Sequence, residues 1–216
     1  MIGDGRGVAD VGTDHGYLPV WLAHRGYTGR IFASDIRPGP LEAARRTARA
    51  ASLEDRISFL LCDGLDSCPQ GEIDTIVIAG MGGDTICGIL ERAEFCLDEK
   101  YTLLLQPMTK AEVLRYWLVN NGFTLTREAV VRDGRTLYQI IEARYLGNMR
   151  LSDAELFVGA RCNIKGSEAA GELVEQGIQR AKKEIAGLEA AAKPNEGRLA
   201  VCRSVLEGLE KMKGEL

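Results

Sequence analysis

The sequence predicts an α/β protein: a doubly wound, mostly parallel sheet that ends in an antiparallel hairpin and is followed by a C-terminal pair of helices. Three observations predict this fold class. From residue 7 to about residue 145, short apolar runs alternate with helical patterns, which is typical of a parallel sheet covered on both faces. Arg132-Asp133-Gly134-Arg135 separates two further apolar runs, and Asp-Gly in that setting indicates a β-hairpin. Beyond residue 150, apolar residues recur at helical spacing.

The first part of the chain divides into short elements in a regular order. Strands are expected at residues 7–11, 30–34, 57–61, 75–79 and 102–106, with helices between them near residues 17–25, 40–51, 85–93 and 110–121. The hairpin arms are residues 124–131 and 137–143. Pro40 suits the first turn of a helix, and Asn121-Gly122 suits a helix end.

The C-terminal part reads as two antiparallel helices. Ser152-Asp153-Ala154-Glu155 has the pattern of a capping box that opens a helix. Two apolar seams follow, on either side of a reversal at Lys193-Pro194-Asn195: Val174, Ile178, Ala181, Ile185 and Leu188, and then Leu199, Cys202, Leu206 and Leu209. We therefore predict a sheet domain at residues 1–148 and a helical hairpin, close to a short coiled coil, at residues 149–216. The alternative is that these helices only cover apolar surface or mediate dimerisation.

Composition limits the classes of partner. With 216 residues, 45% of them hydrophobic, the chain can bury one core and an appendage. The net charge of −4 gives no global indication of nucleic-acid binding, so an RNA partner would need a local basic patch. Candidates for that patch are the arginines near the junction of the two parts: Arg115, Arg127, Arg132, Arg135, Arg144 and Arg150.

No segment is long and apolar enough to span a bilayer, and the N-terminus has no export signal, so we expect a cytoplasmic protein without a membrane partner. The six cysteines form no Cys-x-x-Cys pair and no cluster with histidine. We therefore expect reduced thiols, most of them in the core, and no metal site. A monomer is the expected oligomeric state.

Acidic residues follow three successive strands. The first is followed by Asp10-Val11-Gly12-Thr13-Asp14-His15-Gly16, in which Gly12 and Gly16 permit close approach to a ligand. Asp35 ends the second strand, where a carboxylate can accept hydrogen bonds from both ribose hydroxyls. Asp63-Gly64 ends the third, where an acid and a flexible backbone can recognise an adenine amino group and a ring nitrogen. Each acid could instead cap a helix or lie in a solvated turn.

The three acids together favour one cofactor over another. In this fold the ligand lies beyond the carboxyl ends of the strands, where the strand order reverses. A dinucleotide would bring its pyrophosphate to the first loop, and Asp14 would then stand against two negative charges. S-adenosylmethionine has no phosphate and carries an ammonium and a sulfonium. The acid-rich loops therefore predict S-adenosylmethionine rather than NAD.

The fourth and fifth strands predict the acceptor side. Ile78-Ala79-Gly80-Met81-Gly82-Gly83 lacks the Asn- or Asp-Pro-Pro-aromatic clamp of enzymes that methylate exocyclic amines. Its glycines open space and free backbone N–H groups, so that a flat substrate can lie close to the sulfonium. Met81 lines that surface or, equally, fills a gap in the core. Leu105-Gln106-Pro107 adds a side-chain amide at the same rim.

With these motifs assembled, the chain resembles the TrmK family of bacterial tRNA (adenine-22, N1)-methyltransferases. The resemblance rests on Val8-Ala9-Asp10-Val11-Gly12-Thr13-Asp14-His15-Gly16-Tyr17-Leu18-Pro19, Ala33-Ser34-Asp35 with Gly39-Pro40-Leu41, Asp63-Gly64-Leu65, the Gly80-Met81-Gly82-Gly83 stretch, Leu105-Gln106-Pro107 and the Leu156-Phe157 helix. It spans essentially the whole chain. It implies a class I, Rossmann-like methyltransferase sheet with a C-terminal coiled coil, S-adenosylmethionine as methyl donor, and N1 of an adenine in tRNA as acceptor.

The site is predicted residue by residue. The residues expected at the cofactor are Asp10, Gly12, Thr13, Asp14, His15, Gly16, Asp35, Ile36, Asp63, Gly64, Leu65, Ala79, Gly80 and Met81, and those expected at the substrate are Gly82, Gly83, Gln106 and Pro107. Methylating N1 of adenine creates a cation, which a nearby carboxylate stabilises. Asp14 is the candidate for this catalytic role. His15 either orients Asp14, stacks on the base or only hydrogen-bonds within the loop.

Other functions remain open at this point. A class I methyltransferase for another RNA, a small molecule or a protein would need no basic surface. A cofactor-binding module that docks a partner through its helical hairpin is the reading without catalysis. The seam of that hairpin lies outside every strand-end motif, so we expect the hairpin to serve RNA engagement more than cofactor binding.

Overall fold

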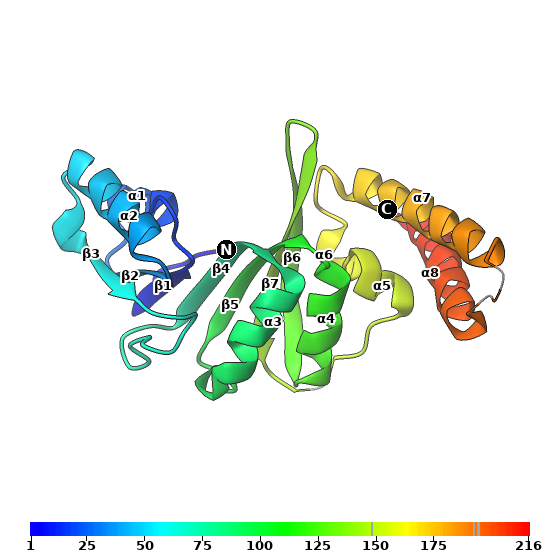
Figure 1. Ribbon diagram of the computed structural model, residues 1–216, viewed down its shortest axis with the longest axis horizontal. Helices are drawn as coiled ribbons and strands as arrows, with labels where there is room; N and C mark the ends of the chain where they lie inside the picture. The colour runs from blue at the N-terminus through cyan, green and yellow to red at the C-terminus, as the bar shows by residue number, and fades with distance from the viewer. Residues whose placement is uncertain (148, 192, 194) are drawn as a thin grey trace.

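The computed structural model describes every residue of the chain except 148, 192 and 194. One mixed sheet runs through it, in the order β3-β2-β1-β4-β5-β7-β6 (Figure 1). Its strands are β1 (Gly7–Val11), β2 (Arg30–Asp35), β3 (Ile57–Leu61), β4 (Thr75–Gly82), β5 (Thr102–Thr109), β6 (Phe123–Asp133) and β7 (Thr136–Tyr145). Strands β1 to β5 pair in parallel, whereas β7 is antiparallel to both β5 and β6. The predicted doubly wound sheet with an antiparallel terminal hairpin is confirmed.

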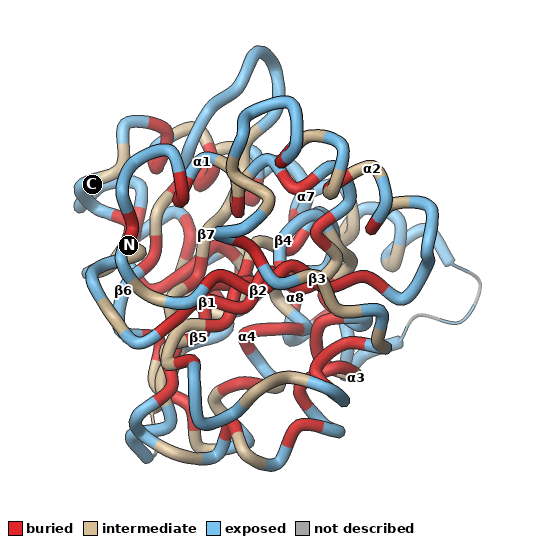
Figure 2. The backbone as a smooth tube through the Cα atoms, turned by 90° about the vertical axis from the view of Figure 1, so that its left-hand side faces the viewer, coloured by how far each residue is buried: buried red, intermediate tan, exposed pale blue. Residues whose placement is uncertain are grey.

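Four helices cover the two faces of the sheet: α1 (Tyr17–His24), α2 (Pro38–Ala50), α3 (Gly83–Arg92) and α4 (Ala111–Asn120). Successive side chains of a strand point to opposite faces, so neighbouring residues enter different cores. Val8 packs in one cluster with Leu22 of α1, and Ala9 packs in another with Ile86 of α3. The central strands are accordingly buried on both sides (Figure 2).

The strand order reverses at β1, which pairs in parallel with β2 on one side and with β4 on the other. Connections leave β1 and β4 toward opposite faces of the sheet, and their carboxyl ends therefore diverge and leave a crevice. This arrangement places the crevice beside the loops that carry the predicted cofactor residues.

Strands β4 and β5 each extend three residues beyond the predicted ends at residues 79 and 106. The glycines after residue 79, which were expected to follow the strand, therefore lie largely within β4. Strand β4 continues to Gly82, which lies opposite Thr109 of β5, with irregular register around Met81. Helix α3 begins at Gly83, two residues before the predicted start. A Cβ atom on Gly83 would lie only 2.3 Å from the Lys110 carbonyl oxygen, so glycine there lets the β4–α3 junction pack against the end of β5.

The C-terminal region begins with α5 (Asp153–Val158) and the short α6 (Arg161–Ile164). The predicted capping box is present, because Ser152 Oγ accepts from the Glu155 N–H and the Glu155 carboxylate accepts from the Ser152 N–H. Helices α7 (Ala170–Glu189) and α8 (Glu196–Glu215) then pack as an antiparallel pair on the far side of the hairpin from β1 (Figure 1). Pro194 of the predicted reversal, and residue 148 at the predicted domain boundary, lie outside the described residues.

The C-terminal helices share a core with the sheet edge. One cluster of buried residues joins Val174 and Leu209 of the helical pair to Val130 of β6, and Leu137 of β7 packs against it. The division of the chain into one domain at residues 1–148 and another at residues 149–216 therefore stays a prediction. The coiled coil also stays a prediction.

The prediction of a basic surface patch is wrong for one of its arginines, Arg115. Arg115 is 1% exposed, and its Nε donates to Glu128 Oε1 at 2.7 Å. Its other nitrogens reach Gln139 Oε1 and the Leu156 carbonyl oxygen. A buried guanidinium must be paired and hydrogen-bonded, and this network satisfies it. Arg115 is thus structural and cannot contact a phosphate at the surface.

Candidate functional site

The loop after β1 is held under the strand ends by backbone contacts. The N–H groups of Gly12 and Thr13 both donate to the Ser34 carbonyl oxygen of β2, each at 2.9 Å. Gly12 has a φ of +73°, and a Cβ atom there would lie 2.1 Å from the Met81 methyl carbon. The positive φ favours glycine at this turn, whereas the neighbouring atom is the movable methyl end of the Met81 side chain rather than the backbone of β4. Gly16, with a φ of +69°, begins α1 and packs on Ala44 of α2.

Asp10 lies beneath this loop. It is 7% exposed, and its Oδ2 accepts from Thr13 Oγ1 at 2.7 Å. Burial raises the pKa of Asp10 to about 6, although the hydrogen bond from Thr13 opposes that rise. Asp10 and Thr13 together therefore shape the loop from below, and neither lines the cavity next to it.

A cavity of about 350 Å³ opens at the carboxyl ends of β1, β2, β3 and β4. It brings together six of the predicted cofactor residues: Gly12, Asp35, Ile36, Asp63, Gly64 and Met81. Asp35 is almost fully buried, and its Oδ1 accepts from the Arg37 N–H at 2.9 Å. The other carboxylate oxygen, Oδ2, accepts no hydrogen bond from the described residues, so it is available to a ligand hydroxyl.

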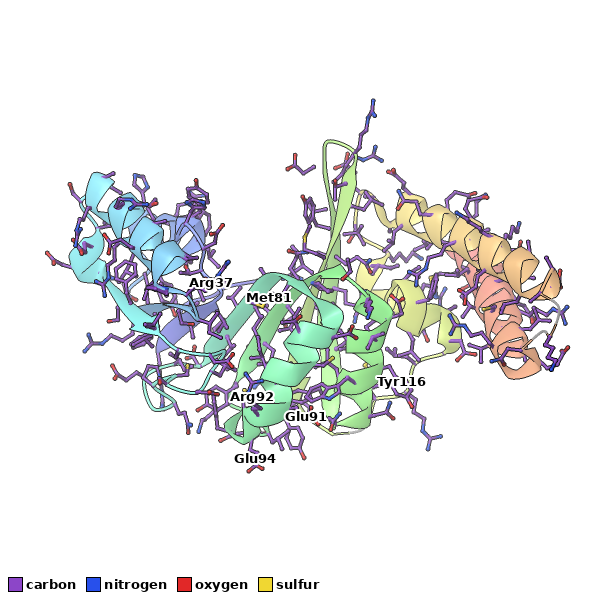
Figure 3. All side chains as sticks on the ribbon, viewed as in Figure 1. Arg37, Met81, Glu91, Arg92, Glu94 and Tyr116 are labelled. Atoms are coloured by element: carbon purple, nitrogen blue, oxygen red, sulfur yellow. The ribbon has the colours of Figure 1, made fainter. Side chains whose placement is uncertain are left out.

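Two lining residues of this cavity, Asp63 and Arg92, form an ion pair. Arg92 of α3 places Nη2 3.0 Å from Asp63 Oδ1, and both side chains are about half exposed. Figure 3 shows Met81 and Arg92 on neighbouring elements of the sheet domain. Water screens such a pair, so Asp63 can exchange its partner for an amino group of a ligand. The sequence did not predict Arg92, Thr85 or Ile89 in the lining, because they occupy ordinary positions on an amphipathic helix.

The remaining predicted residues lie outside this cavity, in several different places. Leu65 is 3% exposed and belongs to the core, whereas Ala79 and Gly80 are exposed at the bend of β4. Gln106 Oε1 accepts from the Gly80 N–H at 3.0 Å, so that amide holds the end of β4 in place. Gly82 and Gly83 continue into α3, as described above. Pro107 lines a different cavity, on the side of the C-terminal helices.

Asp14 and His15 lie at the exposed tip of the loop after β1. Asp14 has a φ of +50°, a left-handed conformation that few residues other than glycine adopt, although aspartate tolerates it. His15 Nε2 lies 3.7 Å from Asp14 Oδ2, and the His15 ring stacks on Tyr17 with centroids 5.5 Å apart. Both side chains are more than half exposed to solvent. Left-handed non-glycine residues often mark functional sites.

No helix among the described residues is long and apolar enough to cross a membrane. In the same part of the chain, no group of three or more histidine, cysteine or acidic side chains is placed to hold a metal ion. Cys87, Cys96 and Cys202 are buried, and burial raises the pKa of Cys96 to about 12, which keeps that thiol protonated.

A known protein family matches the part of the chain that forms the sheet. The methyltransferase domain family matches residues 1–141, well over half of the chain. The chain belongs to this family. The matched part contains every lining residue of the 350 Å³ cavity and ends inside β7.

One protein with a similar sequence is a tRNA methyltransferase. The chain is 35% identical to the tRNA (adenine(22)-N(1))-methyltransferase of Bacillus subtilis over 142 residues, which are 66% of this chain and 60% of that protein. The chain thus matches, by sequence, less than two thirds of the length of this curated relative. The resemblance to the TrmK family is confirmed.

Solved structures extend the likeness to the C-terminal helices. The crystal structure of B. subtilis TrmK is similar with a TM-score of 0.81 and 27% identity, covering 96% of this chain and 92% of that one. A Streptococcus pneumoniae protein solved in complex with S-adenosyl-L-methionine has a TM-score of 0.79 and 27% identity, covering 98% and 94%. The class I fold of the sheet region is confirmed. The structural similarity covers nearly the full chain and includes the C-terminal helices.

Proposed function

We propose that this chain is a methyltransferase that uses S-adenosylmethionine to methylate N1 of an adenine in tRNA, at position 22 as in its relatives. The observation that carries the proposal is the cavity that joins Gly12, Asp35 and Asp63 at the switch point of a methyltransferase-family sheet. The relatives named above supply the acceptor.

The cavity fits the cofactor in size and chemistry. Its volume lies within the range of small-molecule sites, and its lining includes the carboxylates of Asp35 and Asp63. Asp35 would accept hydrogen bonds from the ribose hydroxyls, and Asp63 from the adenine amino group of the cofactor. Gly12 and Met81 line the cavity near its β1 and β4 walls, where the reactive end of the cofactor would lie. When bound, S-adenosylmethionine supplies a methyl group on a positively charged sulfur, and no phosphate meets these acids.

The chain's own residues would act by position and charge. Transfer of a methyl group to a ring nitrogen that already has a lone pair needs no base, so alignment and exclusion of water supply most of the acceleration. The acceptor adenine must leave its stack to reach the cavity. Asp14 would stabilise the positive charge that develops on the methylated base, while His15 would orient Asp14. Gln106 would fix the rim beneath the base through its hydrogen bond to Gly80.

The decisive experiment measures radiolabelled methyl transfer from S-adenosylmethionine to tRNA transcripts and maps the product by mass spectrometry. We expect one methyl group on N1 of a single adenine. Transfer to a protein or a small molecule, or methylation of another base atom, would contradict the proposal. Calorimetry with S-adenosylhomocysteine and NAD tests the cofactor separately, and tighter binding of NAD would exclude it. A monomeric state and a cytoplasmic location remain predictions.

A further inference from the structure

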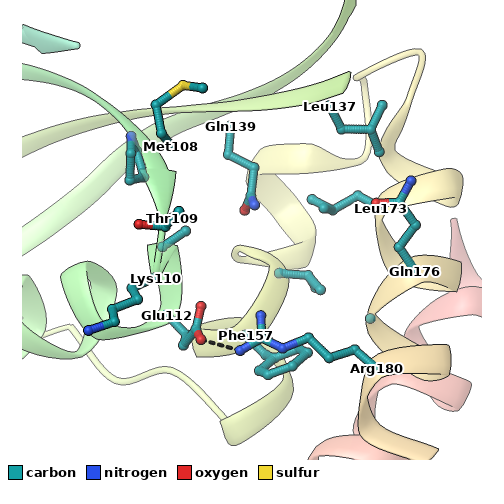
Figure 4. A pocket seen from close by; sticks show the side chains of 14 residues that line it. Met108, Thr109, Lys110, Glu112, Leu137, Gln139, Phe157, Leu173, Gln176 and Arg180 are labelled. Carbon is teal, nitrogen blue, oxygen red and sulfur yellow. Dashed lines mark hydrogen bonds and ion pairs between the residues drawn. The ribbon is translucent and has the colours of Figure 1, made fainter. Parts of the chain in front are cut away.

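A second cavity, of about 290 Å³, lies between the end of β5 and the C-terminal helices (Figure 4). It begins at Pro107, directly after Gln106, and continues past Thr109 and Lys110 to the start of α4. Its opposite wall is the face of α7 that carries Leu173 and Gln176. This cavity is separate from the cofactor cavity and shares no lining residue with it.

The walls of this second cavity suit a flat ring. Leu137 of β7 and Leu173 of α7 supply apolar surface from two sides. The Arg180 guanidinium lies over the Phe157 ring, 4.3 Å from its centroid, and forms an ion pair with Glu112. Figure 4 shows this pair at one end of the cavity. Heteroaromatic rings stack favourably on aromatic side chains and on guanidinium planes.

Polar groups are also placed to recognise the edge of such a ring. The buried Arg115 donates to Gln139 Oε1 at 2.8 Å, which commits that oxygen and leaves the amide N–H groups of Gln139 to a ligand. Gln176 adds a second amide on the facing helix. Polar atoms make up most of the exposed lining of this cavity, so donors and acceptors are available to orient one ligand.

The charges in the cavity favour an uncharged ligand over a phosphate. Arg180 is paired with Glu112, and Lys110 is paired with Asp84 of α3. Each cation is thus compensated by a carboxylate at its side. A phosphate would have to displace one of these carboxylates or accept it as a neighbour, whereas a neutral base meets no such cost.

We propose that this cavity binds the base of a nucleotide that neighbours the methylated adenine, and so holds the RNA in register for transfer. The inference rests on the proposed function. A strand rises about 3.3 Å per residue, so the part of this cavity at Thr109 lies about 10 Å along β5 from Gln106. Base recognition there would account for the joint core of the helical hairpin and the sheet, because a mobile hairpin could not align the acceptor.

The first test fills the cavity from α7. Gln176 is exposed at its mouth, so Gln176→Trp occupies the space without disturbing a buried contact. Gln179→Trp is the matched control, because Gln179 is an exposed glutamine of the same helix outside the lining. We expect Gln176→Trp to lower kcat/KM for tRNA at least tenfold, and the control to stay within twofold of wild type. S-adenosylhomocysteine affinity and the unfolding midpoint should be unchanged in both.

The second test couples the protein to the RNA. Transcripts with a single abasic nucleotide on either side of the target adenine are methylated by the wild type and by both variants. We expect one abasic position to lower wild-type kcat/KM at least tenfold but to affect Gln176→Trp less than twofold. Equal activity of Gln176→Trp and its control, or effects of the variant and the abasic site that simply multiply, would overturn the base subsite. Absence of methylation by the wild type would instead overturn the proposed function, and the subsite with it.

Discussion

The buried pair of Arg115 and Glu128 predicts the largest loss of stability from a single substitution. Both side chains are 1% exposed, and Glu128 Oε1 lies 2.7 Å from Arg115 Nε. Glu128 Oε2 also accepts from the Ala160 N–H at 2.7 Å, so one carboxylate joins α4 to the segment between α5 and α6. Glu128→Ala would leave a buried guanidinium without its counter-charge and a buried N–H without an acceptor.

The two losses set the magnitude. Removing one partner of a buried ion pair costs about 3–5 kcal/mol, and an unsatisfied buried N–H adds about 1–3 kcal/mol. Relaxation and water entry reduce the sum, so we expect the free energy of unfolding to fall by about 4 kcal/mol. For a chain of this size each kcal/mol shifts Tm by about 2–4 °C, which predicts a Tm lower by roughly 8–16 °C.

Urea unfolding followed by circular dichroism measures the effect, with Glu210→Ala as a control. Glu210 forms an exposed pair with Lys182 at 3.1 Å, and such pairs contribute about 1 kcal/mol or less. Arg115→Met combined with Glu128→Leu removes both charges and should be less destabilised than Glu128→Ala, although Ala160 still loses its acceptor. A Glu128→Ala variant within about 1 kcal/mol of wild type would refute the reasoning.

Three further predictions concern the loop and cavity acids. Burial raises the pKa of Asp10 to about 6, above its unfolded value, so its contribution to stability is present at low pH and is lost as pH rises through 6. Between pH 4.5 and 7.5, the free energy of unfolding of wild type should therefore fall by about 2 kcal/mol relative to Asp10→Asn in urea titrations; a constant difference would contradict this. Asp35→Ala should weaken S-adenosylhomocysteine binding by about 1–3 kcal/mol in calorimetry, and unchanged affinity would mean that the ribose is held elsewhere. Asp14→Asn should lower the rate of tRNA methylation by roughly 10²-fold while cofactor affinity drops less, and a parallel loss of both would make Asp14 a ligand of the donor.

Local patterns predicted those parts of the fold that depend on neighbours in sequence. The bounds of β1 and β3 agree with the prediction, because a short apolar run followed by an acid and a glycine needs no distant partner to be recognised. Asp35 and Asp63 were likewise placed at strand ends, and the structure brings both into one cavity. Whether they bind the cofactor is a separate matter, which Asp35→Ala tests for the first of them.

Distant contacts explain what the sequence did not predict. Glycines normally end a strand, yet β4 continues to Gly82 because Thr109 of β5 pairs with it. Arg92 reaches Asp63 only because α3 packs beside the end of β3, so its helical position carries no local signal. An arginine on a surface-like helix was expected at the surface, but Arg115 finds Glu128 in the adjoining hairpin.

The network of Arg115 and Glu128 determines which experiments can distinguish a role of the C-terminal helices in RNA binding from their role in the stability of the fold. Removing everything after Arg150 would remove the Leu156 carbonyl and the Ala160 N–H, which are partners of Arg115 and Glu128, and would expose Val130 of β6. The sheet edge would then contain an incompletely satisfied buried ion pair, so loss of activity in a truncated chain would report folding as much as RNA contact. A substitution at Gln176 leaves the buried network intact, because that side chain is exposed on the outer wall of the cavity. The helical hairpin is therefore better tested from its exposed face than by deletion.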